Sequence, residues 1–288
     1  MFKGSLVALV TPFKKGKVDE EKIGELLEFH IEKGTEGIVP CGCTGEAATL
    51  THEEQKRTIK IVVERVNKRI PVIAGTGSNS TEEALDLTRY AKEAGADGAL
   101  LITPYYNKPT PQGQYLHYKK IANGVSLPLI LYNVPSRTGI SMLPETVAKL
   151  SKIDNVVAIK EASGNLDQVS KILNLCDITV LSGDDSLTLP ILSVGGKGVI
   201  SVVANIVPQD TVGLVKSFEE KNLEEAKEIH NRLFPLCKAM FIETNPIPIK
   251  TAMGILKMLE PEWRLPLTPM SEENVPKLRK ALKNYGLI

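Results

Sequence analysis

The feature that most constrains the fold of this chain is a regular alternation of short apolar runs with longer amphipathic stretches. Eight apolar runs occur at intervals of roughly 20 to 35 residues, and each is followed by a segment with helical periodicity. The runs cover residues 6–12, 37–43, 71–77, 99–104, 128–135, 156–160, 178–184 and 198–205. Strands that alternate with helices pair in parallel through right-handed crossovers. Runs that are apolar along their whole length are typical of parallel strands covered by helices.

The segments between these runs predict the helices. Helical periodicity is expected over 19–32, 80–94, 112–122, 166–175, 186–194 and 208–218, with further helices beginning at Thr51 and Pro144. Thr51 is expected to cap the helix that follows it, with Glu54 at the spacing of a capping box. After the eighth run the pattern changes to helices only, over 223–240, 246–258 and 272–285.

Eight strand–helix units in 288 residues predict an α/β protein with a (β/α)8 TIM barrel. The structural alternative is an open doubly wound sheet, which usually has fewer strands and a glycine-rich first turn when it binds nucleotides. No GxGxxG motif follows the first run, and no Walker lysine motif occurs. We expect the barrel to cover residues 1–220 and a C-terminal helical extension to cover 221–288.

Charge and cysteine content narrow the functional class. The chain has 35 Lys and Arg against 34 Asp and Glu, which argues against a general electrostatic grip on nucleic acid. No stretch has the apolar length of a membrane helix, and the N-terminus lacks the cleavage pattern of a signal peptide. Cys41 and Cys43 lie two apart on an expected strand, and with Cys176 and Cys237 they form neither a zinc motif nor a disulfide framework. A soluble cytoplasmic enzyme without a metal fits best.

One apolar run ends in a lysine. Residues 156–160 lead directly into Lys160 and Glu161, so an amine is expected at the carboxyl end of a strand buried on both faces. Burial lowers the pKa of an amine, and a neutral amine can attack a carbonyl to form a Schiff base. Alternatively, Lys160 pairs with Glu161 or reaches solvent at the mouth of the barrel.

Other polar residues also follow the expected strands, where the reactive groups of such barrels collect. Tyr132 is a candidate proton shuttle for imine chemistry, although it fits a core position equally well. Backbone N–H groups within 42–45 are suited to a carboxylate, and Arg137 to a second one, unless Arg137 pairs with a surface acid. Asp184 and Asp185 resemble a catalytic carboxylate pair, but one of them is rather expected to cap the following helix.

Three of these strand ends carry a family resemblance. The segments Gly42–Glu46, Tyr132–Gly139 and Ile159–Asn165 resemble the pyruvate-dependent class I aldolases of the dihydrodipicolinate synthase and N-acetylneuraminate lyase family. The resemblance extends nearly from end to end. Arg137, in Val-Pro-Ser-Arg-Thr-Gly, is typical of the synthases and speaks against a neuraminate or keto-sugar-acid lyase.

The resemblance implies a reaction and roles for individual residues. Lys160 is expected to form a Schiff base with pyruvate, whose enamine attacks L-aspartate 4-semialdehyde in a step of lysine and diaminopimelate biosynthesis that needs no cofactor. Thr44 and the backbone at Ile200 are expected to hold pyruvate. Arg137 is expected to hold the semialdehyde carboxylate, and Gly183 to line the pocket.

A proton relay is also implied. In the family, a hydroxyl relay joins the tyrosine at Tyr132, a threonine, and a tyrosine that crosses a dimer interface and corresponds to Tyr106. The relay threonine is Cys43 in this chain. A thiol is a weaker hydrogen-bonding group than a hydroxyl, so the relay should be poorer. Cys43 is also the one residue that favours the remaining alternative, a barrel that binds without catalysing.

Assembly and regulation are implied as well. The family is typically a homotetramer built as a dimer of dimers. A lysine feedback pocket of some members corresponds to Ala48, His52, Asn79, Glu83 and Tyr105. Tyr105 and Tyr106 also fit an interface patch. Because Ala47 replaces a serine and Gln55 stands where lysine-sensitive members often have histidine, we expect weak or absent inhibition by L-lysine.

Overall fold

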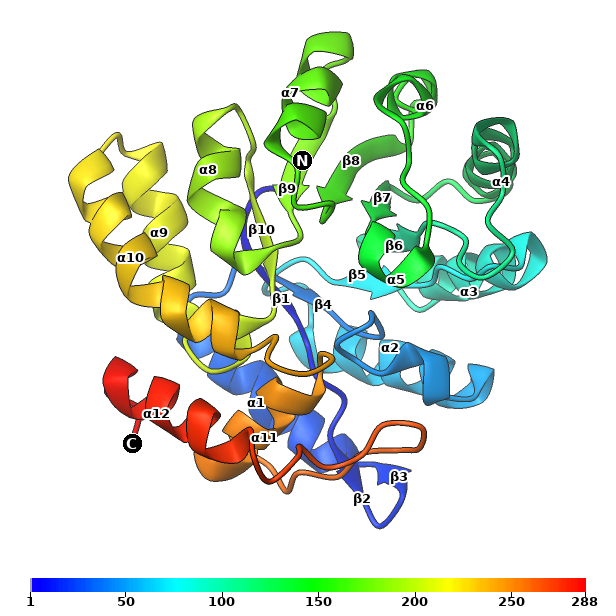
Figure 1. The fold of residues 1–288 in the computed structure, drawn as a ribbon. Coiled ribbons are helices and arrows are strands. Elements are labelled where there is room, and N and C mark those ends of the chain that lie inside the picture. The colour runs from blue at the N-terminus through cyan, green and yellow to red at the C-terminus, as the bar shows by residue number, and fades with distance from the viewer. Residues whose placement is uncertain (1) are drawn as a thin grey trace.

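The computed structural model describes residues 2–288 and contains one eight-stranded parallel sheet wrapped by helices (Figure 1). The strands are β1 (Gly4–Ala8), β4 (Gly37–Val39), β5 (Ile73–Gly75), β6 (Gly98–Ile102), β7 (Leu129–Asn133), β8 (Val156–Glu161), β9 (Thr179–Ser182) and β10 (Gly198–Ser201). Each of the eight expected runs contains or overlaps one strand, so the predicted strand order is confirmed.

The sheet closes on itself. β1 lies between β10 and β4, with Leu6 opposite Ile200 on one side and Gly37 on the other. An isolated parallel bridge pairs Ile38 of β4 with Val72, the residue that precedes β5. This bridge closes the gap between the first and last strands in the order of the sheet. The predicted (β/α)8 barrel is therefore confirmed.

The helices also follow the sequence pattern, except for the short helix over residues 135–138, which it did not predict. They are α1 (Glu20–Glu32), α2 (His52–Val66), α3 (Thr81–Glu93), α4 (Pro111–Gly124), α5 (Pro135–Thr138), α6 (Pro144–Leu150), α7 (Leu166–Leu175), α8 (Thr188–Ser193) and α9 (Pro208–Glu219). α7 has the bounds expected from its periodicity. The capping box forms in full: Glu54 N donates to Thr51 Oγ1 and Thr51 N donates to the Glu54 carboxylate.

Two local predictions were wrong or incomplete. The expected strand over residues 37–43 ends at Val39, and Cys41 and Cys43 lie in the loop that follows. Cys41 has a φ of 56°, a left-handed conformation that a strand does not contain. In addition, a short antiparallel hairpin of β2 (Phe13–Lys14) and β3 (Lys17–Val18) follows β1, where the sequence pattern indicated no strand.

The barrel interior is filled by side chains from alternate strand positions. Tyr132, Ala158, Leu181 and Ile200 are among the buried residues of this interior cluster. Because side chains of a strand alternate between its faces, Tyr132 and Lys160, which are register partners, point inward. The next residue of each strand faces the surrounding helices instead.

The C-terminal extension packs against the barrel. It consists of α10 (Leu223–Ala239), α11 (Ile247–Ile255) and α12 (Val275–Tyr285), drawn in yellow-orange to red beside α9 and α1 in Figure 1. One hydrophobic cluster joins α1 and α2 to α10–α12, so the extension and the barrel share a core. The expected boundary at residue 220 lies in the turn between α9 and α10, and a division into two units there stays a prediction.

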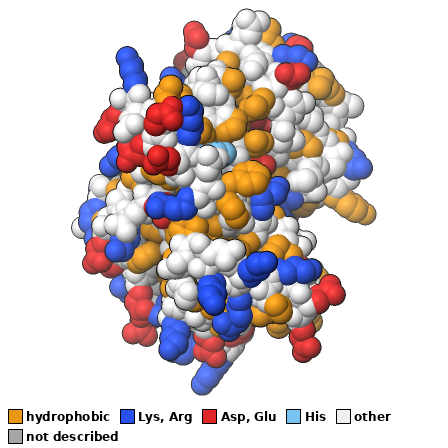
Figure 2. All heavy atoms as spheres, turned by 60° about the vertical axis from the view of Figure 1, so that its left-hand side comes forward, with side chains coloured by type: hydrophobic (Ala, Val, Ile, Leu, Met, Phe, Trp, Pro, Cys, Tyr) orange, Lys and Arg blue, Asp and Glu red, His pale blue; other side chains and the backbone are white. Residues whose placement is uncertain are grey.

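The outer face of α9 and α10 is mixed in charge. Figure 2 shows Lys and Arg side chains interspersed with Asp and Glu on this side of the molecule, with apolar side chains between them. Leu223 and Phe234 of α10 are 49% and 45% exposed. No helix among residues 2–288 is long and apolar enough to cross a membrane.

Candidate active site

Lys160 occupies the interior of the barrel near the carboxyl end of β8. Its residue is 5% exposed, and its Nζ lies 4.4 Å from the centroid of the Tyr132 ring. Within residues 2–288 no carboxylate lies within ion-pair distance of this amine. Burial lowers the pKa of Lys160 from 10.5 to about 8. At pH 7 about a tenth of the amine is therefore neutral and nucleophilic, against less than about a thousandth for a lysine with a pKa of 10.5.

Glu161 does not pair with Lys160. Its buried carboxylate accepts hydrogen bonds from Asn133 Nδ2 at 3.0 and 3.2 Å and from the backbone N–H of Ser163 at 2.7 Å. These contacts hold it on the outer face of the barrel, opposite to the face that Lys160 uses. The alternative in which the two residues form an ion pair was therefore wrong, for the geometric reason that adjacent strand residues face opposite sides.

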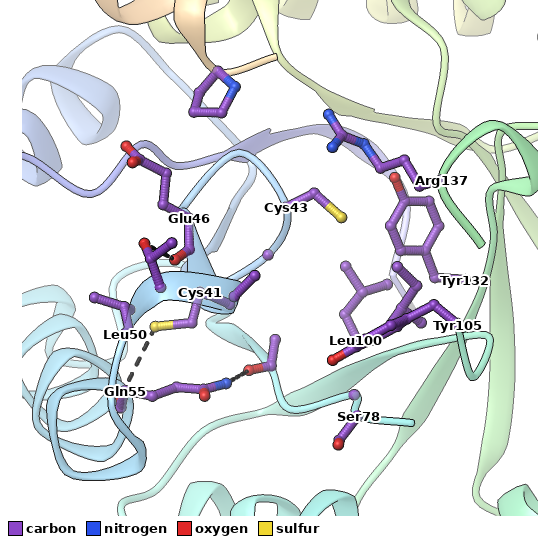
Figure 3. A pocket seen from close by; sticks show the side chains of 18 of the residues that line it. Cys41, Cys43, Glu46, Leu50, Gln55, Ser78, Leu100, Tyr105, Tyr132 and Arg137 are labelled. Atoms are coloured by element: carbon purple, nitrogen blue, oxygen red, sulfur yellow. Dashed lines mark hydrogen bonds between the residues drawn. The ribbon is translucent and has the colours of Figure 1, made fainter. Parts of the chain in front are cut away.

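The Cys43 thiol lies beside the Tyr132 ring in the pocket. Figure 3 shows the Cys43 sulfur and the Arg137 guanidinium on the side of Tyr132 that carries its hydroxyl. Burial raises the pKa of Tyr132 well above its usual value, and the proximity of Cys43 adds to the shift. The phenol therefore stays protonated at neutral pH and is available as a proton donor. Tyr132 is both a core residue and a pocket residue, so its two readings were not exclusive.

Thr44 and Arg137 are linked through a residue that the sequence pattern did not single out. Asn245 Nδ2 donates to Thr44 Oγ1 at 3.0 Å, and the Arg137 guanidinium donates to the Asn245 carbonyl at 2.7 Å. Thr44 is buried, whereas Arg137 is exposed at the rim. No salt bridge involves Arg137 within the described chain, so the expected alternative of a surface ion pair was wrong.

Gly183 lies at the site beside Lys160, whereas Ile200 does not line it. A Cβ added at Gly183 would lie 2.9 Å from Lys160 Cε and 2.7 Å from Ala162 Cβ, so this glycine leaves the space that the lysine side chain occupies. Ile200 is fully buried in the interior cluster with Tyr132 and lines neither of the two cavities described next.

Two adjoining cavities meet at Tyr132 and Arg137. The larger, of about 790 Å³, is also lined by Lys160, Thr44 and Gly183. The smaller, of about 500 Å³, is also lined by Cys43. The structure thus brings together six residues that the sequence placed at the carboxyl ends of the strands: Cys43, Thr44, Tyr132, Arg137, Lys160 and Gly183.

The roof of the larger cavity comes from the C-terminal extension. Lys238, Phe241, Glu243, Thr244 and Asn245 line it from the end of α10 and the loop before α11. The sequence pattern did not predict these residues, because the candidate site residues were sought only at the carboxyl ends of the strands. The polar Glu-Thr-Asn run between two amphipathic segments was the one available signal.

Tyr106 is not part of this pocket within one chain. It is 89% exposed, has a φ of 69°, and lines neither cavity. Four of the five residues expected at a lysine site, Ala48, His52, Glu83 and Tyr105, line the smaller cavity. Asn79 does not, and its carbonyl accepts a hydrogen bond from Asn107 Nδ2 at 2.9 Å.

Asp185 has a structural role that the sequence did not specify. Its buried carboxylate accepts the backbone N–H groups of Val202 and Val203 at 3.0 and 2.9 Å, after β10. Asp184 lies at the N-cap position of the turn over 185–187 but makes no capping hydrogen bond there, and α8 has no side-chain cap. No cluster of three or more His, Cys, Asp or Glu side chains suited to a metal ion occurs in the described range 2–288.

Fold and site together define a (β/α)8 barrel that carries a buried amine of lowered pKa among the carboxyl ends of its strands. A model of the dihydrodipicolinate synthetase family matches residues 1–285, and the chain belongs to this family of enzymes.

Individual relatives agree with this placement. The chain is 59% identical to the 4-hydroxy-tetrahydrodipicolinate synthase of Geobacter sp. (strain M21), with all of both chains covered. It superimposes on a crystal structure of dihydrodipicolinate synthase from Aquifex aeolicus with a TM-score of 0.98 and 52% identity, covering 99% of each chain. A chloride-inhibited dihydrodipicolinate synthase from Acinetobacter baumannii, complexed with pyruvate, matches over all of both chains with a TM-score of 0.98 and 46% identity.

Proposed function

We propose that this enzyme is a 4-hydroxy-tetrahydrodipicolinate synthase, which condenses pyruvate with L-aspartate 4-semialdehyde in lysine and diaminopimelate biosynthesis. The observation that carries the proposal is the unpaired, buried amine of Lys160 at 4.4 Å from the Tyr132 ring. Full-length similarity to enzymes of that name supports the choice of reaction.

The first stage forms an imine. The neutral Lys160 amine attacks the keto carbon of pyruvate, and the C–N bond forms as the carbonyl oxygen takes a proton. Loss of water from this carbinolamine requires a proton on the leaving hydroxyl, which Tyr132 is placed to supply. The Thr44 hydroxyl, held by Asn245, is proposed to bind the pyruvate carboxylate.

The second stage joins the two substrates. Loss of a proton from the pyruvate methyl group gives an enamine, whose carbon attacks the aldehyde and forms the C–C bond. The Arg137 guanidinium at the rim is proposed to hold the semialdehyde carboxylate, because a planar guanidinium binds a carboxylate through two parallel hydrogen bonds. The substrate amine then attacks the imine carbon, which closes the ring and releases Lys160.

Cys43 and Tyr106 are proposed to complete the proton path. Cys43 lies beside Tyr132 in the pocket and is only partly buried. Tyr106 is proposed to reach the same path in a second copy of the chain, since its 89% exposure leaves it outside its own pocket. We accordingly propose a homotetramer made of two such dimers.

Reductive trapping tests the proposal. Pyruvate with borohydride should inactivate the enzyme and leave a stable adduct on Lys160, found by peptide mass spectrometry. Lys160→Ala should give no adduct, whereas Lys238→Ala, which removes an exposed lysine from the roof of the same cavity, should still give it. Absence of the adduct in the wild-type chain would instead support a barrel that binds without imine chemistry.

A coupled assay tests the aldehyde partner. L-aspartate 4-semialdehyde and pyruvate, with dihydrodipicolinate reductase present, should give steady loss of the reduced nicotinamide cofactor. Arg137→Lys should raise the KM for the semialdehyde and leave the pyruvate adduct intact, because an ammonium cannot make the bidentate contact. Trapping without turnover would direct the search to other aldehydes, as in the sugar-acid lyases.

A further inference from the structure

Glu46 and Lys250 form an ion pair deep in the protein. Lys250 Nζ lies 2.6 Å from Glu46 Oε1, and both side chains are fully buried. Every other salt bridge among residues 2–288 has both side chains partly exposed. A buried pair contributes little net stability because both charges lose their hydration. Its presence here therefore calls for a role other than stability.

The lysine of this pair is fixed in place by three different partners. Besides the Glu46 carboxylate, Nζ donates to the Glu262 carbonyl and lies 4.4 Å from the centroid of the Phe13 ring. Two of the three N–H donors of the ammonium group thus have hydrogen-bond acceptors, and the Phe13 ring lies next to its charge. Burial raises the pKa of Glu46 and lowers that of Lys250, and the attraction between the two opposes both shifts.

The glutamate of the pair ends the loop that carries the proposed pyruvate-binding group. Glu46 lies two residues after Thr44 and has a left-handed backbone with a φ of 54°. Its backbone N–H donates to the Cys43 carbonyl at 3.1 Å, which closes the turn around Thr44. Because a non-glycine residue resists this conformation, the side-chain anchor and the turn depend on each other.

The same segment of the C-terminal extension holds this loop at two points. Asn245 donates to Thr44 Oγ1 at 3.0 Å, and Lys250, at the start of α11, holds Glu46. The two contacts lie on opposite sides of Gly45, whose carbonyl accepts a hydrogen bond from Thr11 Oγ1 at 2.7 Å. The C-terminal extension therefore contacts the loop on both sides of Gly45, through Asn245 at Thr44 and through Lys250 at Glu46.

We propose that Glu46 and Lys250 are positioning residues, through which the C-terminal extension sets the place of Thr44 for binding the pyruvate carboxylate. The inference rests on the proposed function and adds to it. Lys250 lines neither cavity, and Glu46 lines only the smaller one, so neither side chain lines the cavity that holds Lys160 and both act on pyruvate binding through the loop.

The test replaces both charges at once. In Glu46→Gln/Lys250→Met no unpaired charge remains in the interior, and such neutral replacements of buried pairs are often tolerated. We expect the double variant to keep a melting temperature near that of the wild type. Its Kd for pyruvate, measured from the concentration dependence of borohydride trapping at Lys160, should rise by about tenfold or more, since small misplacements of binding groups carry costs of this order. The KM for the semialdehyde should not change.

Two controls separate positioning from loss of stability. Met253→Ala creates a cavity on the fully buried side of α11 without removing the ion pair, so it should lower the melting temperature and leave the pyruvate Kd unchanged. Lys250→Met alone leaves the Glu46 carboxylate unpaired and should both destabilise the chain and raise the Kd. A double variant that is folded and binds pyruvate with wild-type affinity would overturn the proposal.

The wild-type measurement distinguishes this proposal from the function on which it rests. If wild-type enzyme forms no pyruvate adduct at Lys160, the proposed function fails and the positioning role fails with it. If the wild-type chain is trapped and the double variant is trapped at the same pyruvate concentrations, the function stands and only the positioning role is wrong.

Discussion

At the scale of single residues, the reactivity of Lys160 depends on its burial among apolar side chains. The interior of the barrel disfavours the ammonium form, and a pKa lowered from 10.5 to about 8 increases the neutral fraction at pH 7. The negative charge of Asp185 opposes this effect, but among the described residues no carboxylate lies within ion-pair distance of Lys160. The outward direction of Glu161, set by the alternation of the strand, is therefore a condition for the chemistry.

A pH profile checks this account. The rate of pyruvate trapping by borohydride at low pyruvate should rise with pH and level off above about pH 8, because only the deprotonated amine attacks. Below that value the rate should fall about tenfold per pH unit. A trapping rate that continues to rise with pH up to the ordinary lysine pKa of 10.5 would contradict the effect of burial. Prior measurement of borohydride decay at each pH provides the control.

Cys43 leads to a second prediction at this scale. Cys43→Thr should raise kcat several-fold, because a hydroxyl is a stronger hydrogen-bond donor and acceptor than a thiol beside Tyr132. Cys43→Ala should lower kcat, since the relay would lose a member. The coupled assay measures both, and Cys41→Ser, which changes a thiol outside the relay that points to the Gln55 carbonyl, is the matched control. An unchanged rate in Cys43→Thr would exclude the relay at this position.

At the scale of elements, Asn205 ties the ends of β1 and β10 together. Its side-chain amide donates to the Ala8 carbonyl at 2.8 Å and to the Val202 carbonyl at 2.9 Å, and its Oδ1 accepts from Val10 N at 3.2 Å. Asn205 is fully buried, so none of these backbone groups has water as a substitute.

Removing this amide should weaken the closure of the barrel. Asn205→Ala is expected to lower the free energy of unfolding by about 1–3 kcal/mol for each buried group left unpaired. Urea titration measures the loss, and Asn231→Ala, at an exposed position of α10, should change stability little. A loss at Asn205 no greater than at Asn231 would show that water replaces the amide.

The elements also show what the sequence could predict. Hydrophobic periodicity predicted the eight strands and their helices, because burial of one face or of both faces determines which positions in the sequence are apolar. It extended the strand after Gly37 too far, since Cys41 and Cys43 are as apolar as strand residues and nothing local reveals the left-handed turn at Cys41. Asn245 and Lys250 were missed because their partners, Thr44 and Glu46, lie about two hundred positions earlier.

At the scale of the whole molecule, the position of Tyr106 leads to a prediction about assembly. Lys160→Ala and Tyr106→Phe should each have little activity alone, and mixing them after mild dissociation should restore activity. In a mixed dimer, one site then has its own Lys160 and Tyr106 from the other copy.

The control for this experiment uses two residues of the same pocket. Lys160→Ala mixed with Tyr132→Phe should stay inactive, because both positions line one chain's cavity and no mixed site is complete. Failure of the first mixture to regain activity would show that Tyr106 serves its own chain or none. Sedimentation at several concentrations establishes whether dimers and tetramers form.

Feedback by L-lysine also belongs to this scale. We expect weak or absent inhibition, because Gln55 lies in the smaller cavity with its amide already donating to the Gly75 carbonyl at 2.8 Å. A lysine titration of the coupled assay measures it, and Gln55→His should increase the response. Strong inhibition of the wild-type chain at micromolar lysine would contradict the prediction.

The place of β1 between β10 and β4 has a consequence for synthesis. A ribosome makes β1 first and β10 about two hundred residues later, so a growing chain carries an unpaired parallel edge until the last strand emerges. Translation at about 5–20 residues per second makes this interval roughly 10 to 40 seconds. Exposed strand edges recruit other chains. Protection by a chaperone is therefore needed most before β10 and the extension have left the exit tunnel.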